Sequence, residues 1–431
     1  MKALQPLLRG RAPGQIVIQV TDHCNAACPQ CGMNRNAGGK RRHMSVACLR
    51  RILYAAARNG VQAVSFTGGE PLLRRKFLIE ALKHASTLGF PLIRTGTNGF
   101  VFQKPEAADF RDRVSRLADA LAETQLRNFW ISIDSVLPEV HEAMRGLPGV
   151  IRGIEKAMPI FNDRGIYPSA NLGINRNIAG GFTAGLFPEA YSSAQAYLES
   201  FYRRYVEAFH RFYRFAADLG FTIANTCYPM SADTTGADGL SPVYAASSSR
   251  RLISFSKPEK VALFQALKAV VPEHRWRLRI FSPLSGLHHL AAAHGHGRSS
   301  PYPCRGGVDF FFVSADGAGT FPCGYRGREN FGPYWRMAPN SGARKASCDR
   351  CDWECFRDPS EMLGPLLCDF RWPPAAITGL IRGRDFYRLW ISDLAYYADA
   401  DFFNGRKPPR WSRLTRWRTG HNAGAAAQRH F

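Results

Sequence analysis

Short apolar segments alternate with helical segments along the first half of this 431-residue chain. Six of the apolar segments predict β-strands, because each is brief, rich in β-branched or aromatic residues and bounded by turn-forming residues. These segments are residues 15–20, 61–66, 91–95, 128–133, 167–174 and 221–228. Strands separated by helices indicate a parallel α/β fold, and six of them favour a partial (β/α)6 barrel.

Unusual residues lie at the ends of the first four predicted strands. Residues 21–31 read TDHCNAACPQC after the first strand, and the motifs TGGEP, TGTNG and SIDS end the next three. In barrels of alternating strands and helices, the carboxyl ends of the strands share one edge, and that edge carries the active site. The sequence therefore predicts one composite site there.

Three cysteines dominate the first of these motifs. Cys24, Cys28 and Cys31 are separated by three and then two residues. Soft thiolate ligands placed so close together predict a zinc site or an iron–sulfur cluster. A closed structural site needs four ligands, so three cysteines leave one position for water, for substrate or for a ligand from elsewhere in the chain. A zinc site completed by another Cys or His remains the alternative.

The composition favours a globular protein with metal ligands rather than disulfides. Hydrophobic residues make up 45% of the chain and charged residues 21%, which is enough to build a sizeable core. We find no secretory signal and no apolar run long enough to cross a bilayer, so we expect a cytoplasmic protein. Eleven cysteines in a reducing compartment then indicate metal binding. The net charge of +23 predicts anionic partners.

The length predicts one large domain and at least one smaller one. We expect five regions: an N-terminal extension at 1–14, the barrel core at 15–230, a linker with connecting helices at 231–302, a small cysteine-rich domain at 303–370 and a basic extension at 371–431. Within the linker region, residues 288–301 contain four histidines among small residues and read as a solvated connector. After Asp401 the basic extension has no acidic residue and reads as a solvated or disordered tail, although its Arg and Trp residues could contact phosphates.

The spacing of CNAACPQC resembles the cluster motif of radical S-adenosylmethionine (radical SAM) enzymes. The resemblance implies that Cys24, Cys28 and Cys31 bind a [4Fe–4S] cluster with one open iron, which the methionine part of S-adenosylmethionine chelates. In that family an electron from the cluster cleaves the cofactor to a 5′-deoxyadenosyl radical, which abstracts a hydrogen atom from the substrate. It also implies a fold similar to a partial TIM barrel.

The motifs on the next three strands resemble the same family. Gly68, Gly69 and Glu70 match its GGE motif, which holds the methionine amino group, and Asn98 lies in a turn often found after the third strand. Further matches are Ser132, Asp134 and Arg145, where serine and arginine commonly contact the cofactor carboxylate, and, more weakly, Asn171 and Asn175 for the ribose. One position departs from the pattern, because Gln30 replaces the usual aromatic residue beside the adenine.

The cysteine-rich region resembles the SPASM and twitch extensions of this family, which hold auxiliary [4Fe–4S] clusters. Two apolar runs around a Gly-rich turn at 308–324 predict a β-hairpin there. The candidate ligands for one or two auxiliary clusters are Cys304, Cys323, Cys348, Cys351, Cys355 and Cys368. The first four resemble a one-cluster twitch set, and the last two are surplus to it. A zinc ribbon is the alternative, because paired cysteines after a hairpin also suit zinc. We expect the remaining cysteines, Cys48 and Cys227, to pack in the core.

These observations predict a radical SAM enzyme that oxidises its substrate or forms a new bond in it, with an auxiliary cluster aiding the electron transfer. The substrate is a peptide or a small molecule, and the resemblance implies an electron donor such as a flavodoxin or ferredoxin. Two alternatives stay open: a non-catalytic zinc or iron–sulfur interaction module, and a radical SAM enzyme acting on nucleic acid through its basic tail.

Overall fold

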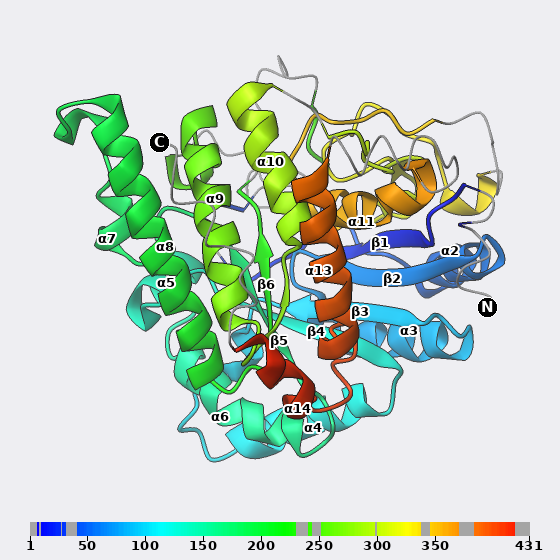
Figure 1. Cartoon of the computed structure of the whole chain (residues 1–431). Coiled ribbons are helices and arrows are strands. Elements are labelled where there is room, and N and C mark those ends of the chain that lie inside the picture. The colour runs from blue at the N-terminus through cyan, green and yellow to red at the C-terminus, as the bar shows by residue number, and fades with distance from the viewer. Residues whose placement is uncertain are drawn as a thin grey trace.

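The computed structural model describes residues 7, 10–26, 28–31, 41–229, 240–243, 251–297, 300–337, 345–369 and 383–418. These residues contain one nine-stranded sheet with the order β7-β6-β5-β4-β3-β2-β1-β8-β9 (Figure 1). Neighbouring strands are parallel from β7 to β8, and β8 and β9 are antiparallel. The strands are β1 (Gly14–Thr21), β2 (Val61–Gly68), β3 (Leu92–Thr97), β4 (Leu126–Ser132), β5 (Ser169–Gly173), β6 (Ile223–Cys227), β7 (Arg279–Phe281), β8 (Phe310–Val313) and β9 (Thr320–Phe321).

Helices follow most of the strands, as the alternation in the sequence predicts. They are α2 (Val46–Arg58), α3 (Arg75–Thr87), α4 (Phe110–Ala122), α5 (Pro138–Arg145), α6 (Val150–Asn162), α7 (Gly181–Ala184), α8 (Ala194–Asp218), α9 (Lys257–His274), α10 (Leu284–His296), α11 (Glu354–Gly364), α13 (Arg384–Ala400) and α14 (Trp411–Leu414). All six predicted strands are present as β1 to β6, so the parallel α/β fold with a partial barrel is confirmed. None of the described helices combines the length and the apolar character needed to span a bilayer.

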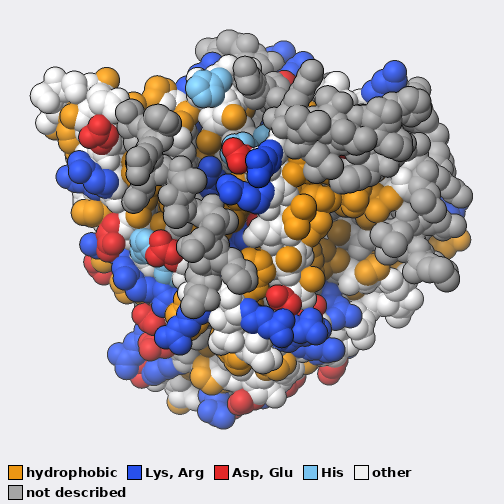
Figure 2. Space-filling model, in the orientation of Figure 1, with side chains coloured by type: hydrophobic (Ala, Val, Ile, Leu, Met, Phe, Trp, Pro, Cys, Tyr) orange, Lys and Arg blue, Asp and Glu red, His pale blue; other side chains and the backbone are white. Residues whose placement is uncertain are grey.

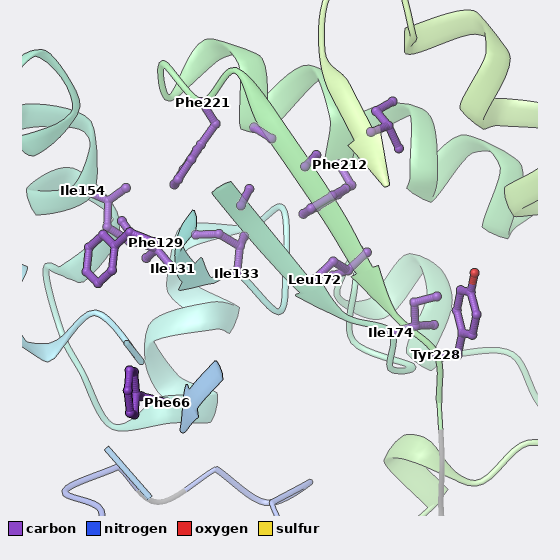
Figure 3. Close-up of a cluster of buried hydrophobic side chains, with 14 of the residues drawn as sticks. Phe66, Phe129, Ile131, Ile133, Ile154, Leu172, Ile174, Phe212, Phe221 and Tyr228 are labelled. Carbon is purple, nitrogen blue, oxygen red and sulfur yellow. The ribbon is translucent and has the colours of Figure 1, made fainter. Parts of the chain in front are cut away.

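The two faces of the sheet differ in polarity. Along β4, Phe129 and Ile131 are buried and belong to the cluster in Figure 3, which they share with Ile154 from α6. The alternate residues Asn128 and Trp130 are only half-buried and point away from that cluster, since successive side chains of a strand face opposite sides. One face therefore packs on helices, while the other is polar and partly open.

The sheet is curved around the start of α11. Gln15 of β1 donates to the sulfur of Cys355, and the guanidinium of Arg94 in β3 lies 4.0 Å from the same sulfur. The preceding residue, Glu354, forms a side-chain hydrogen bond with Cys227 of β6. Two consecutive residues can contact the first, third and sixth strands only if the sheet wraps around them. The polar face is therefore the concave face of a partial barrel.

The hairpin that was predicted in the cysteine-rich region is present as β8 and β9, and it extends the barrel sheet. Residues Gln15 to Ile18 of β1 pair in parallel with Phe310 to Val313 of β8. The start of the cysteine-rich region is thus fixed to the first strand by backbone hydrogen bonds. The five-region division of the chain stays a prediction.

Two segments that the sequence suggested were solvated are packed instead. The histidine-rich segment 288–301 lies largely within α10, whose Leu287 and Leu290 are buried. In the basic tail after Asp401, Leu414 is buried in a cluster with Tyr396 and Ala400 of α13, and Trp417 Nε1 donates to Asp399 over 3.2 Å. The apolar residues between the basic ones thus hold the described part of this tail against α13, which itself packs against α10. Residues 371–382 and 419–431 of the basic extension lie outside the described residues.

Candidate functional site

The cysteine loop begins directly after β1, at the edge where the sequence placed the site. Cys28 is buried, and Cys24 and Cys31 are half-buried against the main core. The N–H of Cys31 donates to the carbonyl oxygen of Cys28 over 3.1 Å, which folds the loop back on itself. Burial, and then neighbouring negative groups that include Cys31 and Cys24, raises the pKa of the Cys28 thiol to about 12. The three thiols thus lie near one another.

Gly68 and Gly69 lie directly beneath this loop. The N–H of Gly69 donates to the carbonyl oxygen of Thr21 over 2.8 Å. A Cβ atom added at Gly69 would lie 2.2 Å from the carbonyl oxygen of His23, and one added at Gly68 would lie 2.4 Å from that of Thr21. Such contacts are forbidden for any residue with a side chain, so the two glycines allow the end of β2 to approach the cysteine loop.

Glu70 joins the ends of the second and third strands. Its side chain accepts hydrogen bonds from the N–H of Leu72 over 2.9 Å and from the N–H of Asn98 over 2.6 Å. Asn98 in turn donates to the side chain of Asn25 over 3.0 Å, and its Nδ2 lies 3.6 Å from the sulfur of Cys24. Burial raises the pKa of Glu70 to about 7. The GGE and TGTNG motifs therefore support the cysteine loop from one side.

Asp134 and Arg145 form a buried ion pair on the other side. Arg145 NH2 lies 2.8 Å from Asp134 Oδ2, and Gln30 donates to the same oxygen over 2.8 Å. The backbone of Asp134 is fixed as well, because its N–H donates to His141 Nδ1 over 3.0 Å and its carbonyl oxygen accepts from Asn175 over 2.8 Å. The pair is therefore tied to the cysteine loop through Gln30.

Several polar atoms around this pair have no partner among the described residues. They are Arg145 Nε, Gln30 Oε1 and His141 Nε2, all of them buried. Burial acts to lower the pKa of Arg145, but Asp134, Cys28 and Cys31 together outweigh it and the net shift is upward. Burial lowers the pKa of His141 to about 4. Beside the cysteine loop, the site thus holds a permanent cation with an unused donor and a neutral histidine.

Ser132 and Asn171 lie further along the polar face. Ser132 ends β4 and pairs in register with Asn171 of β5, and both are half-buried. Asn171 accepts from Asn225 of β6 over 2.9 Å and donates to the sulfur of Cys227 over 3.2 Å. Asn175 is used in bracing Asp134, so of the two predicted asparagines only Asn171 faces the concave side with its polar neighbours.

Four of the six C-terminal cysteines come together. The N–H of Cys304 donates to the carbonyl oxygen of Cys348 over 2.8 Å. The pKa of Cys351 is raised well above the ordinary value, first by burial and then by Cys323, Cys304 and Cys348. These four thiols come from three separate segments, so the folding of the chain assembles them.

Cys355 and Cys368 have other neighbours than these four thiols. The groups that act on Cys355 include Arg94, Glu354 and Gln15, which places it inside the barrel. Cys368 is exposed, near Tyr387 of α13. The sequence predicts both cysteines as surplus to a one-cluster set, and it missed Arg94 and Gln15 as interior residues. The alternation of side chains along β1 and β3 carried that signal.

The surroundings of the cysteine loop fit the two implied cofactors. Among the described residues, no group of three or more His, Cys, Asp or Glu side chains is placed so that it could hold a metal ion. The fit therefore rests on chemistry: three thiols suit three irons of a [4Fe–4S] cluster and leave the fourth open. The unused guanidinium nitrogen of Arg145 suits a carboxylate such as that of S-adenosylmethionine.

Comparison with known proteins gives a consistent result. Residues 18–176 match the family model described as the Radical SAM superfamily, and this range includes the cysteine loop and Arg145. A Methanopyrus kandleri protein named "Probable GTP 3′,8-cyclase" is 38% identical over 153 residues, which are 35% of this chain and 45% of that protein. The GTP 3′,8-cyclase of Vibrio parahaemolyticus is 31% identical over 149 residues, which are 33% and 41% of the two chains. The chain thus spans less than half the length of these curated relatives.

Among solved structures, native anSMEcpe with bound AdoMet and the Cp18Cys peptide aligns with a TM-score of 0.48 and 16% identity, over 75% of this chain and 79% of that chain. The segment that holds the cysteine loop, the GGE motif and Arg145 is thus similar to the radical SAM superfamily, and this similarity covers residues 18–176 of the chain.

Proposed function

We propose that the chain is a radical SAM enzyme whose substrate binds on the concave face of the barrel. When bound, the cluster and S-adenosylmethionine supply a 5′-deoxyadenosyl radical, which removes a hydrogen atom from the substrate. The observation that supports this proposal best is the arrangement around the cysteine loop. The three thiols lie in the loop that the backbone closely approaches at Gly69, and the buried Arg145 cation lies beside them.

The residues of this site have distinct roles in the proposal. Cys24, Cys28 and Cys31 hold the cluster and leave one iron open. Arg145 binds the cofactor carboxylate through the nitrogen that has no partner in the described structure. Asp134 holds Arg145 in place, because a buried guanidinium without a carboxylate would be costly. Glu70 and Asn98 keep the loop in position from the opposite side.

We assign the four assembled C-terminal cysteines to one auxiliary [4Fe–4S] cluster that accepts or relays an electron. Their mutual proximity supports a four-ligand site, and the pairing of β8 with β1 holds the segment after Cys304 against the barrel. The concave face would then lie between the two metal sites. Zinc is the second candidate for these cysteines, because two pairs of thiols next to a hairpin also suit it.

The partners of the chain follow from this scheme and from the charge. A reduced donor such as a flavodoxin or ferredoxin would supply electrons, and a reducing compartment, the cytoplasm, would keep the thiols available. The net charge of +23 favours acidic partners, and Figure 2 shows Lys and Arg side chains interspersed with Asp and Glu on one face. The anSMEcpe structure contains a peptide and the cyclases are named for GTP, so both peptides and small molecules remain substrates to test.

The decisive experiment is the formation of 5′-deoxyadenosine by anaerobically reconstituted, reduced protein. Cys28→Ala should abolish it, whereas Cys48→Ala should leave it unchanged, because Cys48 lies on α2 outside both cysteine groups. Full activity in the Cys28 variant would contradict the proposal. Analysis of the wild type for iron, sulfide and zinc decides between the enzyme and a metal-binding module, since zinc without iron would favour the module.

A further inference from the structure

The concave face of the sheet carries an unusual set of side chains for the middle of a protein. Register pairs align Ser65 with Arg94 and Arg94 with Asn128 across β2, β3 and β4. On the next strands, Asn171 pairs with Asn225. The alternate residues of the same strands are apolar and packed against helices (Figure 3). Polar side chains therefore occupy two levels of the concave face: Ser65, Arg94 and Asn128 at one level, and Ser132, Asn171 and Asn225 nearer the carboxyl ends of the strands.

Solvent reaches these side chains. Arg94, Asn128, Asn171 and Asn225 are all half-buried, although their strands lie in the interior of the sheet. Their apolar neighbours in sequence, Ile93, Phe129, Ala170 and Ala224, are almost completely buried. Exposure confined to one side of the central strands means that the concave face is less tightly packed than the face that the helices cover.

Arg94 is a cation of this face, and its charge acts there on Glu354 and Cys355 of α11. Its Nε donates to the hydroxyl of Ser65 over 2.9 Å, and NH2 has only the distant sulfur of Cys355 at 4.0 Å. Across the part of the chain that the structure describes, no carboxylate lies within ion-pair distance of it. Glu354, which faces the same interior, is held by the N–H of Tyr228 over 3.3 Å and by Cys227.

An aromatic surface completes this polar face. Trp130 is half-buried on the same face, and a Cβ atom added at Gly96 would lie 2.2 Å from its indole ring. The indole therefore lies flat across the backbone of β3. A flat aromatic face beside amides and a guanidinium can pack against the ring of a polar molecule while the amides bind its hydroxyl or carbonyl groups.

We propose that the substrate is a small polar molecule with an anionic group, phosphate or carboxylate, which Arg94 binds, while its polar ring lies over Trp130 and contacts Asn128 and Asn171. This inference rests on the proposed function, since it assigns the substrate of the same site. A guanidinium pairs with either anion in a planar, two-point geometry, so both belong to the same chemistry. An apolar ligand would cover the amides and the guanidinium without giving them partners, which costs free energy at each group.

The test is the binding of three ring-matched probes to the reconstituted holoprotein with S-adenosylmethionine present, measured by calorimetry. The probes are glucose 6-phosphate, glucuronate and uncharged glucose, which share a polar ring and differ in the anion. At least one anion should bind more tightly than glucose, and the tighter of the two identifies the anionic group. Arg94→Gln should weaken that anion by about ten-fold or more and leave glucose unchanged, and Arg94→Lys should restore part of the loss.

Matched controls separate this role from a general effect of charge or folding. Arg58→Gln removes the same charge from the exposed end of α2 and should leave all three affinities unchanged. Asn171→Leu should weaken all three probes, because the amide contacts the ring and not the anion. Equal binding of the anions and glucose to the wild type, or full anion affinity in the folded Arg94→Gln protein, would overturn the inference. So would tighter binding of an uncharged tripeptide amide than of either anion.

Failure of this inference is distinguishable from failure of the proposed function. Probe binding requires no cleavage of S-adenosylmethionine, whereas formation of 5′-deoxyadenosine requires no particular substrate class. Anion binding that depends on Arg94 in a protein that never forms 5′-deoxyadenosine would refute the enzyme proposal alone. The reverse pattern would refute the substrate assignment alone.

Discussion

The two cysteine groups of this protein are built in opposite ways. Cys24, Cys28 and Cys31 lie in one short loop, and the charge that lies beside them is the Arg145 cation with its Asp134 partner. The C-terminal four come from three segments, and the charges that raise the pKa of Cys351, after burial, are those of the other three thiols of its group. The N-terminal group has three thiols from one loop and lies next to a cation with an unused donor. The C-terminal group has four thiols from segments far apart in the sequence.

This difference separates a site that binds a ligand from a site that is closed by the chain. A three-thiol group next to an unpaired donor leaves both a coordination position and a charge for a cofactor. A four-thiol group supplies every ligand itself and suits electron storage or structure. The predictions below test this contrast, and they run from the largest expected effect to the smallest.

Replacing Cys24, Cys28 and Cys31 together with Ala should remove one complete cluster and all formation of 5′-deoxyadenosine. About four irons should remain per chain if the C-terminal group holds one cluster. Iron and sulfide quantitation on the anaerobically reconstituted protein measures this. If the triple variant retained no iron at all, the C-terminal group would not be an independent iron–sulfur site.

Cys351→Ala and Cys355→Ala should have different effects on the second group. Loss of Cys351 should remove about four irons, because it takes one of four ligands, whereas loss of Cys355 should leave the iron content unchanged. Mössbauer or EPR spectra of the two variants provide the measurement. Equal iron loss in both variants would show that Cys355 is a ligand. The C-terminal group would then include a thiol that lies inside the barrel.

The sequence makes the N-terminal group visible and leaves the membership of the C-terminal group open, for a physical reason. The spacing of Cys24, Cys28 and Cys31 is a property of eight consecutive residues, so the loop they form is visible without the fold. Membership of the second group depends on where α11 begins relative to β3, and nothing in the spacing of Cys351 and Cys355 shows that the helix turns the second thiol into the barrel.

The same reasoning explains the other successes and failures. Six strands were predicted because each carries its own apolar and turn-forming residues. The hydrogen bond of Gln30 to Asp134 joins residues 104 positions apart, so the sequence showed only that Gln30 was unusual and not what it does. The histidines of α10 suggested a connector, because the buried leucines between them were outweighed by small and polar residues.

Arg145→Met should affect the N-terminal group alone. Removal of one partner from a buried ion pair leaves Asp134 unpaired and should destabilise the protein by about 3–5 kcal/mol, and affinity for S-adenosylmethionine should fall as well. Urea unfolding and equilibrium dialysis measure the two effects. Arg152→Met is the control, because its ion pair with Glu106 is exposed. Iron loss from the C-terminal group in the Arg145 variant would show that the two groups are coupled.

Gly69→Ala should distort the cysteine loop without any change in charge. Its Cβ atom would lie 2.2 Å from the carbonyl oxygen of His23, so the backbone must move, at a cost of about 1–3 kcal/mol. The EPR spectrum of the reduced cluster should change, while the C-terminal group stays intact. Gly181→Ala serves as the control, because a Cβ atom there meets nothing within 4 Å. An unaltered spectrum and unaltered stability would mean that the end of β2 does not support the loop.

Gln30→Leu should have the smallest effect, and it tests how the loop is tied to its cation. The variant removes one donor from Asp134 Oδ2 but leaves the contact with Arg145, so we expect a loss of about 1–2 kcal/mol in unfolding free energy. Both groups should keep their iron, and affinity for S-adenosylmethionine should fall less than in Arg145→Met. Gln62→Leu is the matched control, because that amide only caps its own turn at Gly60. If Gln30→Leu and Gln62→Leu had the same stability and the same affinity for S-adenosylmethionine, Asp134 would position Arg145 without help from the cysteine loop. The N-terminal group would then depend on residues far from the loop more than its sequence suggests.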